Sequence, residues 1–271
     1  MLRARIVLIG IGSVSLLGAS LLPRLEAVGG SRHPANSSEQ RTPVLVELFT
    51  SEGCSDCPPA DALLERLDRS QPVSGAELIV LSEHVDYWDD IGWRDPYSSH
   101  QYSERQGAYA GHFGLGSVYT PQMVIDGHFE LVGSDERRAV RAIESATKVE
   151  KIPVSLSAIH LEARNVASLR ISAGQLPPSV AARSADVLIA TADESDESHV
   201  SRGENAGRTL KHIAVLRSLT RVGTVDHSGE FSQDVKINVN RANAGNLRVV
   251  AFVQESTAGQ VFGVVSARLS N

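Results

Sequence analysis

The two cysteines of the chain, Cys54 and Cys57, are separated by two residues and are followed directly by Pro58 and Pro59. This spacing lets one thiolate attack a partner while the second sulfur resolves the mixed disulfide. A disulfide across so short a loop removes little entropy from the unfolded chain, and a protein of 271 residues does not need one for its core. The pair therefore indicates thiol–disulfide chemistry more than a structural crosslink.

The neighbouring segments place the pair between a strand and a helix. Residues 43–50 form a β-rich apolar run typical of a buried strand, and residues 58–70 carry apolar side chains at the spacing of an amphipathic helix. A helix N-terminus offers free N–H groups and a positive dipole end, which stabilise a thiolate. Cys-x-x-Cys at this position is a specific signal for a thioredoxin-like redox site.

The residues around the pair are unusual for such a site. Proline is tolerated in the first helical turn but clashes further in, so we expect the helix to start late, with Ser55 or Asp56 as N-cap. Glu52, Asp56 and Asp61 surround the cysteines, and negative charge disfavours a thiolate. We therefore expect Cys54 to be weakly acidic, and the pair to favour the disulfide and to act as a reductant or a slow exchanger.

A second group of reactive and aromatic residues lies in the stretch 83–96, which contains both tryptophans. It follows the apolar run 76–85, and functional sites gather at the carboxyl ends of strands in α/β sheets. We expect a groove near Cys54, with one histidine as proton shuttle or ligand. The expected groove residues are His84, Asp86, Tyr87, Trp88 and Trp93. The alternative is a packed loop with a hydrogen-bonded histidine.

A metal site can be built from the same residues. Cys54, Cys57 and His84 would supply two thiolates and one imidazole, a set that suits Cu(I) or Zn. Secreted thioredoxin-like copper chaperones use a similar set, but their cysteines usually stand three residues apart, which counts against this alternative. We expect His212 to be a surface or core histidine and not a ligand.

The order of apolar runs predicts an α/β segment over residues 43–150 and an all-β segment over residues 151–271. In the first segment strands alternate with helices, which implies parallel pairing of the first strands, and a final hairpin implies an antiparallel edge. In the second, short β-rich runs are separated by turn residues at regular intervals, which predicts a β-sandwich of about seven strands.

The N-terminus has the layout of a secretory signal peptide over residues 1–27. Arg3 and Arg5 precede an apolar run at 6–22, and a Gly/Ser-rich linker follows at 28–42. We expect the protein to be periplasmic or secreted, where disulfides persist. The alternative is an uncleaved signal that anchors it in the membrane, because the run reaches the lower limit of a membrane span.

The composition limits the classes of molecule that the protein is expected to bind. The net charge of -6 argues against a nucleic-acid binder, which would present a basic face. Thiol–disulfide exchange needs no organic cofactor, because the electrons reside in the two sulfurs. We expect protein or small-thiol substrates and a redox partner that supplies or accepts electrons. The oligomeric state is left open.

Three stretches together resemble one secreted thioredoxin-like bacterial family, catalogued as a domain of unknown function, number twelve twenty-three. They are VELFTSEGCSDCPPAD, HVDYWDDIGWRDP and VYTPQMVIDG, and the resemblance covers about residues 43–271. It implies a thioredoxin-like domain at 43–150, with a central mixed sheet flanked by helices, followed by a β-sandwich domain at 151–271. It brings no established activity.

By position, the thioredoxin resemblance implies roles for five residues. Cys54 would be the exposed attacking thiol and Cys57 the resolving thiol. Thr120-Pro121 would hold the cis-proline that faces the cysteines and shapes a groove for an extended peptide. Glu47 would be the buried acid that exchanges protons with Cys57, although it is offset by one position. The resulting prediction is a thiol–disulfide oxidoreductase; the alternatives are a redox-inactive binding module that uses the groove, and the metal carrier.

Overall fold

The first predicted strand forms β1 (Thr42–Thr50) in the computed structural model, which describes residues 41–162, 165–182, 184–239 and 245–269. The predicted signal peptide and nearly all of the predicted linker lie outside the described residues. No helix in the described ranges is both long and apolar enough to span a bilayer.

The order of elements in the first half is the predicted one. After β1 come α1 (Pro58–Ser70), β2 (Ala76–His84), α2 (His100–Phe113), β3 (Gln122–Ile125), β4 (Phe129–Val132) and α3 (Glu136–Ala146). β1 and β2 are parallel, while β3 runs antiparallel to β1 and pairs with β4 as a hairpin.

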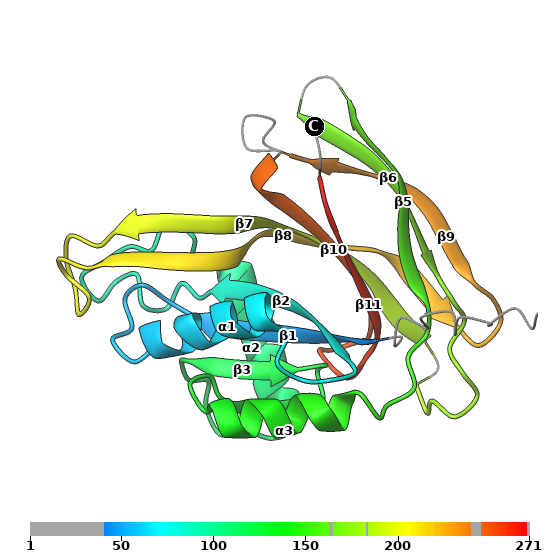
Figure 1. Cartoon of the computed structure of the whole chain (residues 1–271), viewed down its shortest axis with the longest axis horizontal. Coiled ribbons are helices and arrows are strands. Elements are labelled where there is room, and N and C mark those ends of the chain that lie inside the picture. Colours follow the sequence, from blue (N-terminus) through cyan, green and yellow to red (C-terminus); the bar gives the residue numbers. More distant parts are fainter. Residues whose placement is uncertain (1–40, 163–164, 183, 240–244, 270–271) are drawn as a thin grey trace, which may run out of the picture. The chain divides into compact units, whose positions relative to one another are not determined.

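The second half of the described chain consists of strands, as its β-rich runs predict. They are β5 (Val154–Glu162), β6 (Val166–Ala173), β7 (Ser184–His199), β8 (Thr209–Asp226), β9 (Phe231–Asn238), β10 (Leu247–Glu255) and β11 (Val261–Arg268). β7 and β8 form a long antiparallel hairpin, drawn in yellow tones in Figure 1.

The predicted fold class, a thioredoxin-like domain followed by a separate β-sandwich, is wrong. Within the described residues an eight-stranded mixed sheet, ordered β11-β10-β7-β8-β2-β1-β3-β4, crosses the expected domain boundary at residue 150. β8 joins β2 in parallel at Ser82 and Val215. β5, β6 and β9 form a second, three-stranded sheet.

The pairing of β8 with β2 could not be predicted from the sequence for a physical reason. Periodicity identifies a strand but not the strand edge with which it pairs, because side-chain alternation reports faces and not hydrogen-bonding partners. With β1 on one side only, β2 would present a free edge of N–H and C=O groups, which proteins cover or pair. β8 pairs at this edge and thereby joins the two halves.

The alternation of β1 divides the core around this sheet between two faces. Val46 and Leu48 pack with residues of α1 and α3, whereas Leu45 and Phe49 face the side of α2. A strand buried on both faces reads as a continuous apolar run, which is why residues 43–50 show no polar alternation. A further core lies between the two sheets.

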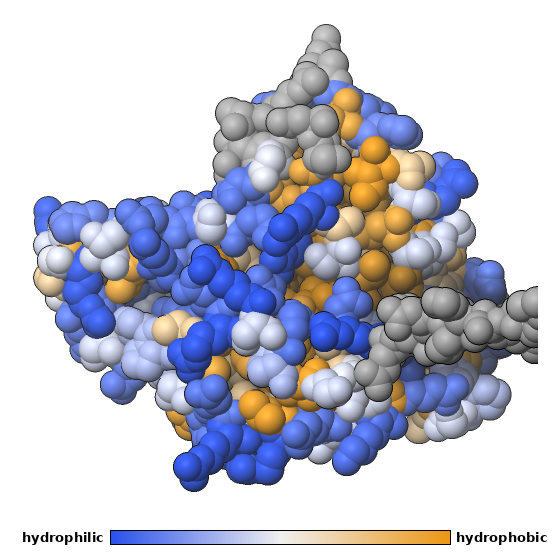
Figure 2. Space-filling model, viewed as in Figure 1, coloured by the Kyte–Doolittle hydropathy of each residue, from blue (hydrophilic) through white to orange (hydrophobic). Residues whose placement is uncertain are grey.

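The surface differs between these regions. Figure 2 shows hydrophobic side chains on the viewed face over β10 and β11, whereas the surface over the outer part of the β7–β8 hairpin is mostly hydrophilic.

A buried ionic cluster connects the sheet to α2. Arg105 of α2 bonds Glu47 through its Nε at 2.8 Å, lies 3.5 Å from Glu83, and donates to Gln254 of β10 at 2.9 Å. Burial raises the pKa of Glu83 well above its usual range, the Glu47 carboxylate raises it further, and Arg105 offsets this only in part. One buried base thus lies beside two acids, and the pKa of Glu83 stays above its usual range.

The cluster predicts the effect of Glu83→Gln. The folded state holds the Glu83 proton where the unfolded chain has lost it, so wild-type stability falls as pH rises above the unfolded value of about 4.3. Gln stays neutral at every pH. The free energy of unfolding of the variant minus that of wild type should therefore rise by up to about 1.4 kcal/mol per pH unit within this window. Urea denaturation from pH 4.5 to 8 measures this; parallel curves would contradict it.

Candidate functional site

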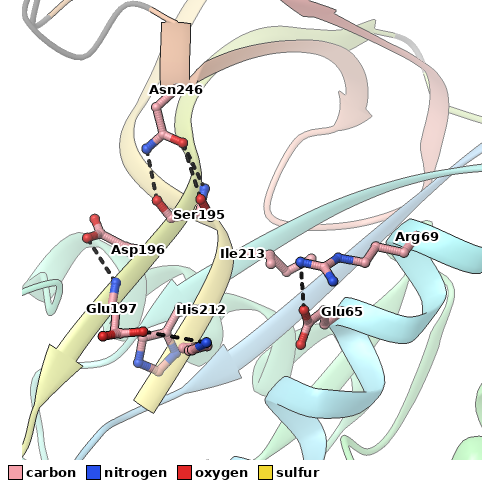
Figure 3. A pocket seen from close by; sticks show the side chains of 9 residues that line it. Glu65, Arg69, Ser195, Asp196, Glu197, His212, Ile213 and Asn246 are labelled. Carbon is pink, nitrogen blue, oxygen red and sulfur yellow. Dashed lines mark hydrogen bonds and ion pairs between the residues drawn. The ribbon is translucent and has the colours of Figure 1, made fainter. Parts of the chain in front are cut away.

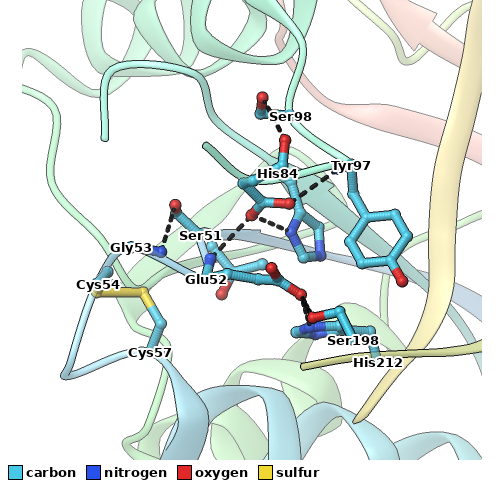
Figure 4. Close-up of polar contacts among 12 residues, drawn as sticks. Ser51, Glu52, Gly53, Cys54, Cys57, His84, Tyr97, Ser98, Ser198 and His212 are labelled. Carbon is cyan, nitrogen blue, oxygen red and sulfur yellow. Dashed lines mark hydrogen bonds and ion pairs between the residues drawn. A yellow bond between two sulfur atoms is a disulfide. The ribbon is translucent and has the colours of Figure 1, made fainter. Parts of the chain in front are cut away.

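Cys54 and Cys57 form a disulfide in the loop between β1 and α1, as their spacing predicts (Figure 4). The predicted N-cap, Ser55 or Asp56, is wrong: Cys57 is the N-cap, without a side-chain capping bond, and the two prolines occupy the first two helical positions. At these positions an N–H would have no partner within the helix, so its absence costs the helix nothing.

The helix start also offers few N–H groups to a thiolate. The first two helical residues are prolines and have none. The N–H of Glu52 donates to Asp95 Oδ2 at 2.8 Å, and the N–H of Ser55 donates to Glu204 Oε2 at 3.0 Å. Carboxylates therefore already occupy donors on both sides of Cys54.

The expectation of an exposed attacking thiol is wrong in this structure. Cys54 is 1% exposed and Cys57 is fully buried. Trp88 lies against the loop, since a Cβ on Gly53 would stand 3.0 Å from Trp88 Cβ. Asn205, in the turn between β7 and β8, donates to the carbonyl oxygens of Glu52 and Cys54, each at 2.9 Å.

The Thr120-Pro121 peptide bond is cis, as the resemblance implies. Trp88 Nε1 donates to Thr120 Oγ1 at 2.9 Å, so the tryptophan contacts both the cysteine loop and the cis-proline segment. A Cβ on Gly133 would come within 3.1 Å of both Pro121 and Ala60 of α1. The cis-proline thus lies beside the first turn of the helix that follows Cys57.

The carboxylate of Glu52 is the centre of a buried polar cluster beside the disulfide loop (Figure 4). It accepts hydrogen bonds from Trp93 Nε1 at 2.7 Å and from Ser198 Oγ, and it lies 3.1 Å from His212 Nε2. Ser198 and His212 belong to β7 and β8, so the hairpin supplies two of these three partners of the carboxylate.

His84 is buried in the same cluster, packed against other side chains. Its Nδ1 lies 2.7 Å from Asp95 Oδ2, and its ring contacts those of His212 and Tyr97 edge to face. Burial lowers the pKa of His84, but Asp95 and the neighbouring acids outweigh burial, so the pKa is raised. Burial likewise raises the pKa of Asp95, but the ion pair and two N–H donors bring it below its ordinary value.

Asp61 closes the cluster on the side of α1. Thr50 Oγ1 donates to its Oδ1 at 2.9 Å, and its Oδ2 lies 4.0 Å from His212 Nδ1. Burial raises the pKa of Asp61, and the nearby histidines offset this only in part. Asp61 is one helical turn beyond Cys57, whose carbonyl accepts the Asp61 N–H at 3.1 Å.

The predicted groove residues divide between two surroundings. Trp88 and Trp93 reach the cysteine loop and its Glu52, as described above. Asp86 faces α2, where it accepts from Ser103 Oγ and its pKa is lowered by that bond. Tyr87 is partly exposed and bonds Gln106 of α2 at 3.1 Å.

Glu47 lies on the other face of the sheet from α1 and bonds Arg105 and Tyr109. The structure thereby separates it from Cys57, which precedes α1. The buried acids near the cysteines are Glu52, Asp61 and Asp95, while Asp56 and Glu204 are exposed. Of the buried acids, only Glu52 and Asp61 stood out in the sequence, and no local pattern marks His212, Ser198 or Asn205, because β8 reaches the site only through tertiary pairing.

In the part of the chain that the structure describes, no group of three or more His, Cys, Asp or Glu side chains is arranged to hold a metal ion. The set of Cys54, Cys57 and His84 is not such a group, because the two sulfurs bond each other.

A polar cavity of about 570 Å³ is lined by residues of α1 and of the hairpin and shares His212 with the Glu52 cluster (Figure 3). Its lining includes acidic and basic side chains, and neither cysteine lines it. The lining residues are Glu65, Arg69, Ser195, Asp196, Glu197, Lys211, His212, Ile213 and Asn246. With opposite charges already paired, such as Glu65 with Arg69 at 2.9 Å, it selects no single ligand class.

Comparisons with known proteins place these features in a wider group. The model of a family described as "Protein of unknown function (DUF1223)" matches residues 45–254. None of the curated proteins matches the chain.

Two solved structures are similar over most of the chain. Protein AGR_C_4864 from Agrobacterium tumefaciens is 25% identical, with a TM-score of 0.63, over 85% of this chain and 96% of that one. HBP35 of Porphyromonas gingivalis is 12% identical, with a TM-score of 0.62, over 84% of this chain and 76% of that one. The second likeness concerns the fold alone.

The cluster predicts that Glu52→Gln destabilises the protein by about 3–5 kcal/mol, because it removes one member of a buried charged set and leaves His212 without its partner. Urea denaturation at pH 7 measures the loss. Glu65→Gln is the control, since its pair with Arg69 is exposed and should change stability by less than about 0.5 kcal/mol. Equal effects of the two substitutions would contradict the prediction.

Proposed function

The chain belongs to the family described as protein of unknown function (DUF1223), a description that gives no activity, and we propose that it performs thiol–disulfide exchange through Cys54 and Cys57. The observation that carries the proposal is the disulfide itself, formed between β1 and α1 beside the cis Thr120-Pro121 bond. The element order from β1 to α3, the cysteine spacing and the cis-proline also support membership of the thioredoxin superfamily.

In the exchange, a thiolate of a dithiol partner attacks Cys54 Sγ. The Cys54–Cys57 bond breaks, and its electron pair leaves on Cys57 Sγ, which takes up a proton. The second thiol of the partner then attacks the mixed disulfide and releases Cys54 as a thiolate. The partner ends as a disulfide and the pair as two thiols, and the reverse sequence oxidises a partner. Both directions proceed without an organic cofactor.

Exposed apolar side chains on the segments around the pair suit a protein partner. Among the described residues, the exposed large hydrophobic side chains are Tyr87, Ile91, Val118 and Val132. The first two lie in the loop of Trp88, Val118 precedes the cis-proline segment, and Val132 pairs with Gln122 directly after Pro121. Exposed apolar side chains grouped at one place favour contact with another protein.

Export is part of the proposal. A stable disulfide suits an oxidising compartment, and the sequence of residues 1–27 has the layout of a signal peptide. A partner in that compartment would supply or accept the electrons.

A redox-inactive binding module is the second candidate, and the burial of both cysteines favours it. Cysteine variants separate the two. If Cys54 attacks, Cys57→Ser should accumulate mixed disulfides with protein partners because the resolving thiol is missing, and Cys54→Ser should accumulate none. Non-reducing gels of alkylated extracts measure this, with wild type as control. Partner binding that survives both substitutions, without any mixed disulfide, would favour the binding module.

The direction of electron flow follows from the charges. Glu52, Asp61 and Glu204 surround the pair, and prolines replace two N–H donors, so the thiolate form of Cys54 gains little stabilisation. The disulfide is then favoured, as in a reductant.

We expect the Cys54 thiol in the Cys57→Ser variant to have a pKa of about 7 or above, and the wild-type pair to have a reduction potential near about -270 mV or lower. Thiolate absorbance against pH and equilibration with glutathione measure these quantities. A pKa of about 5 or lower, or a potential near about -120 mV, would show an oxidant instead.

A further inference from the structure

The turn between β7 and β8, residues 200–208, lies directly on the loop that carries the disulfide, and we call it the tip. It is closed by hydrogen bonds between Val200 and Arg208 at 3.0 Å and from the Gly207 N–H to the Val200 carbonyl at 2.8 Å. Its contacts with the disulfide loop join residues about 150 positions apart in the chain. The tip therefore belongs to the redox site in space, although nothing in its sequence indicates redox chemistry.

Asn205 is the central residue of the tip. It is 1% exposed, its Nδ2 donates to the carbonyls of Glu52 and Cys54, and its Oδ1 accepts from Arg208 at 2.8 Å. The Nδ2 group thus holds the tip on the disulfide loop, and Oδ1 bonds within the tip. Replacing it leaves two buried carbonyls without these donors, which weakens the closed arrangement.

Two further contacts support Asn205. Glu204 accepts the Ser55 N–H at 3.0 Å, directly after Cys54. Gly203, at a φ of +76°, approaches the loop of Trp93 so closely that a Cβ would stand 3.2 Å from Trp93 Cβ. The tip thus contacts both segments that surround the disulfide.

The outer part of the hairpin that carries the tip has no further strand partner in the sheet among the described residues. β10 pairs with β7 only as far as Asp193, and β2 pairs with β8 only at Val215. Beyond these points, from Ser195 to Ile213, the two strands pair with each other alone. A two-stranded ribbon is at best marginally stable by itself, so its position depends on the contacts of its inner face and tip.

We propose that the tip is a gate over the Cys54–Cys57 disulfide, and that Asn205 is the positioning residue that holds it closed. A protein thiol needs a direct approach to Cys54 Sγ, and Cys54 is only 1% exposed while the tip holds the loop backbone at Glu52, Cys54 and Ser55. A small dithiol needs a smaller opening of this loop than a protein does. The gate therefore discriminates between partners by size. This inference rests on the proposed exchange function.

The first test measures the gate without any redox step. In wild type, the Ser55 amide should be protected only in the closed state, because its acceptor, Glu204, belongs to the tip, whereas the Gly207 amide bonds within the tip and is an internal reference. Asn205→Ala should raise the exchange rate of the Ser55 amide roughly tenfold relative to that of Gly207. Asn246→Ala is the matched control, because Asn246 bonds Ser195 at the base of the hairpin and touches no part of the disulfide loop. Unchanged rates in Asn205→Ala would overturn the gate.

The second test compares how fast a small dithiol and a dithiol protein reduce the disulfide. The rates of disulfide reduction by dithiothreitol and by a reduced dithiol protein are followed by alkylation and mass. Asn205→Ala should speed the reaction with the protein dithiol roughly tenfold and that with dithiothreitol much less. Equal acceleration of both rates, or acceleration of neither, would overturn the proposal. If Asn205→Ala fails to fold, Glu204→Ala removes an exposed side chain of the tip and should give the same direction of effect.

The two tests separate the gate from the function. If amide exchange shows opening but no protein dithiol exchanges with any variant, the proposed exchange function fails and the gate stands as a conformational feature. If wild type exchanges readily with the protein dithiol and Asn205→Ala leaves both amide exchange and the rate ratio unchanged, the function stands and the gate fails.

Discussion

The pairing of β8 with the edge of β2 is the constraint on which the arrangement of the site depends. Backbone pairing between the two strands is limited to Ser82 and Val215, yet it fixes where the rest of β8 and its hairpin partner β7 must lie. From this junction, β8 continues back past α1, which brings His212 to Glu52 and the tip to the cysteine loop. Without that pairing the disulfide would lie at an open helix start, where thiols are usually reactive.

The same junction explains what the sequence could and could not predict. The cysteine pair, the helix with prolines in its first turn, and the strand and helix order up to residue 146 follow from local spacing and periodicity, and the structure contains all of them. The sheet partners of β7 and β8 do not follow from local pattern. For that reason the separate β-sandwich was a wrong prediction, and His212, Ser198 and Asn205 could not be placed at the site.

His84 shows a second limit of the same kind. Its position after a strand suggested a groove residue or a ligand, because polar residues at carboxyl ends of strands often face solvent or substrate. Its actual surroundings are set by Asp95 and by a histidine about 130 residues away, and these make it a buried, paired side chain. The hydrogen-bonded, packed alternative describes it, and only tertiary contacts distinguish the two readings.

Two buried ionic clusters lie on the sheet, and they differ in their balance of acids and bases and in their distance from the cysteines. On the face of α2, Arg105 satisfies Glu47 and nearly reaches Glu83, and this cluster lies in the interior, apart from the cysteines. Beside the disulfide loop, Glu52, Asp61 and Asp95 outnumber His84 and His212, so the acids are only partly balanced. An excess of acid beside a disulfide disfavours the thiolate that would form when the bond opens. The charges and the hairpin therefore act on the same loop, because the acids lie beside the disulfide and Asn205 of the hairpin turn holds the backbone of Glu52 and Cys54.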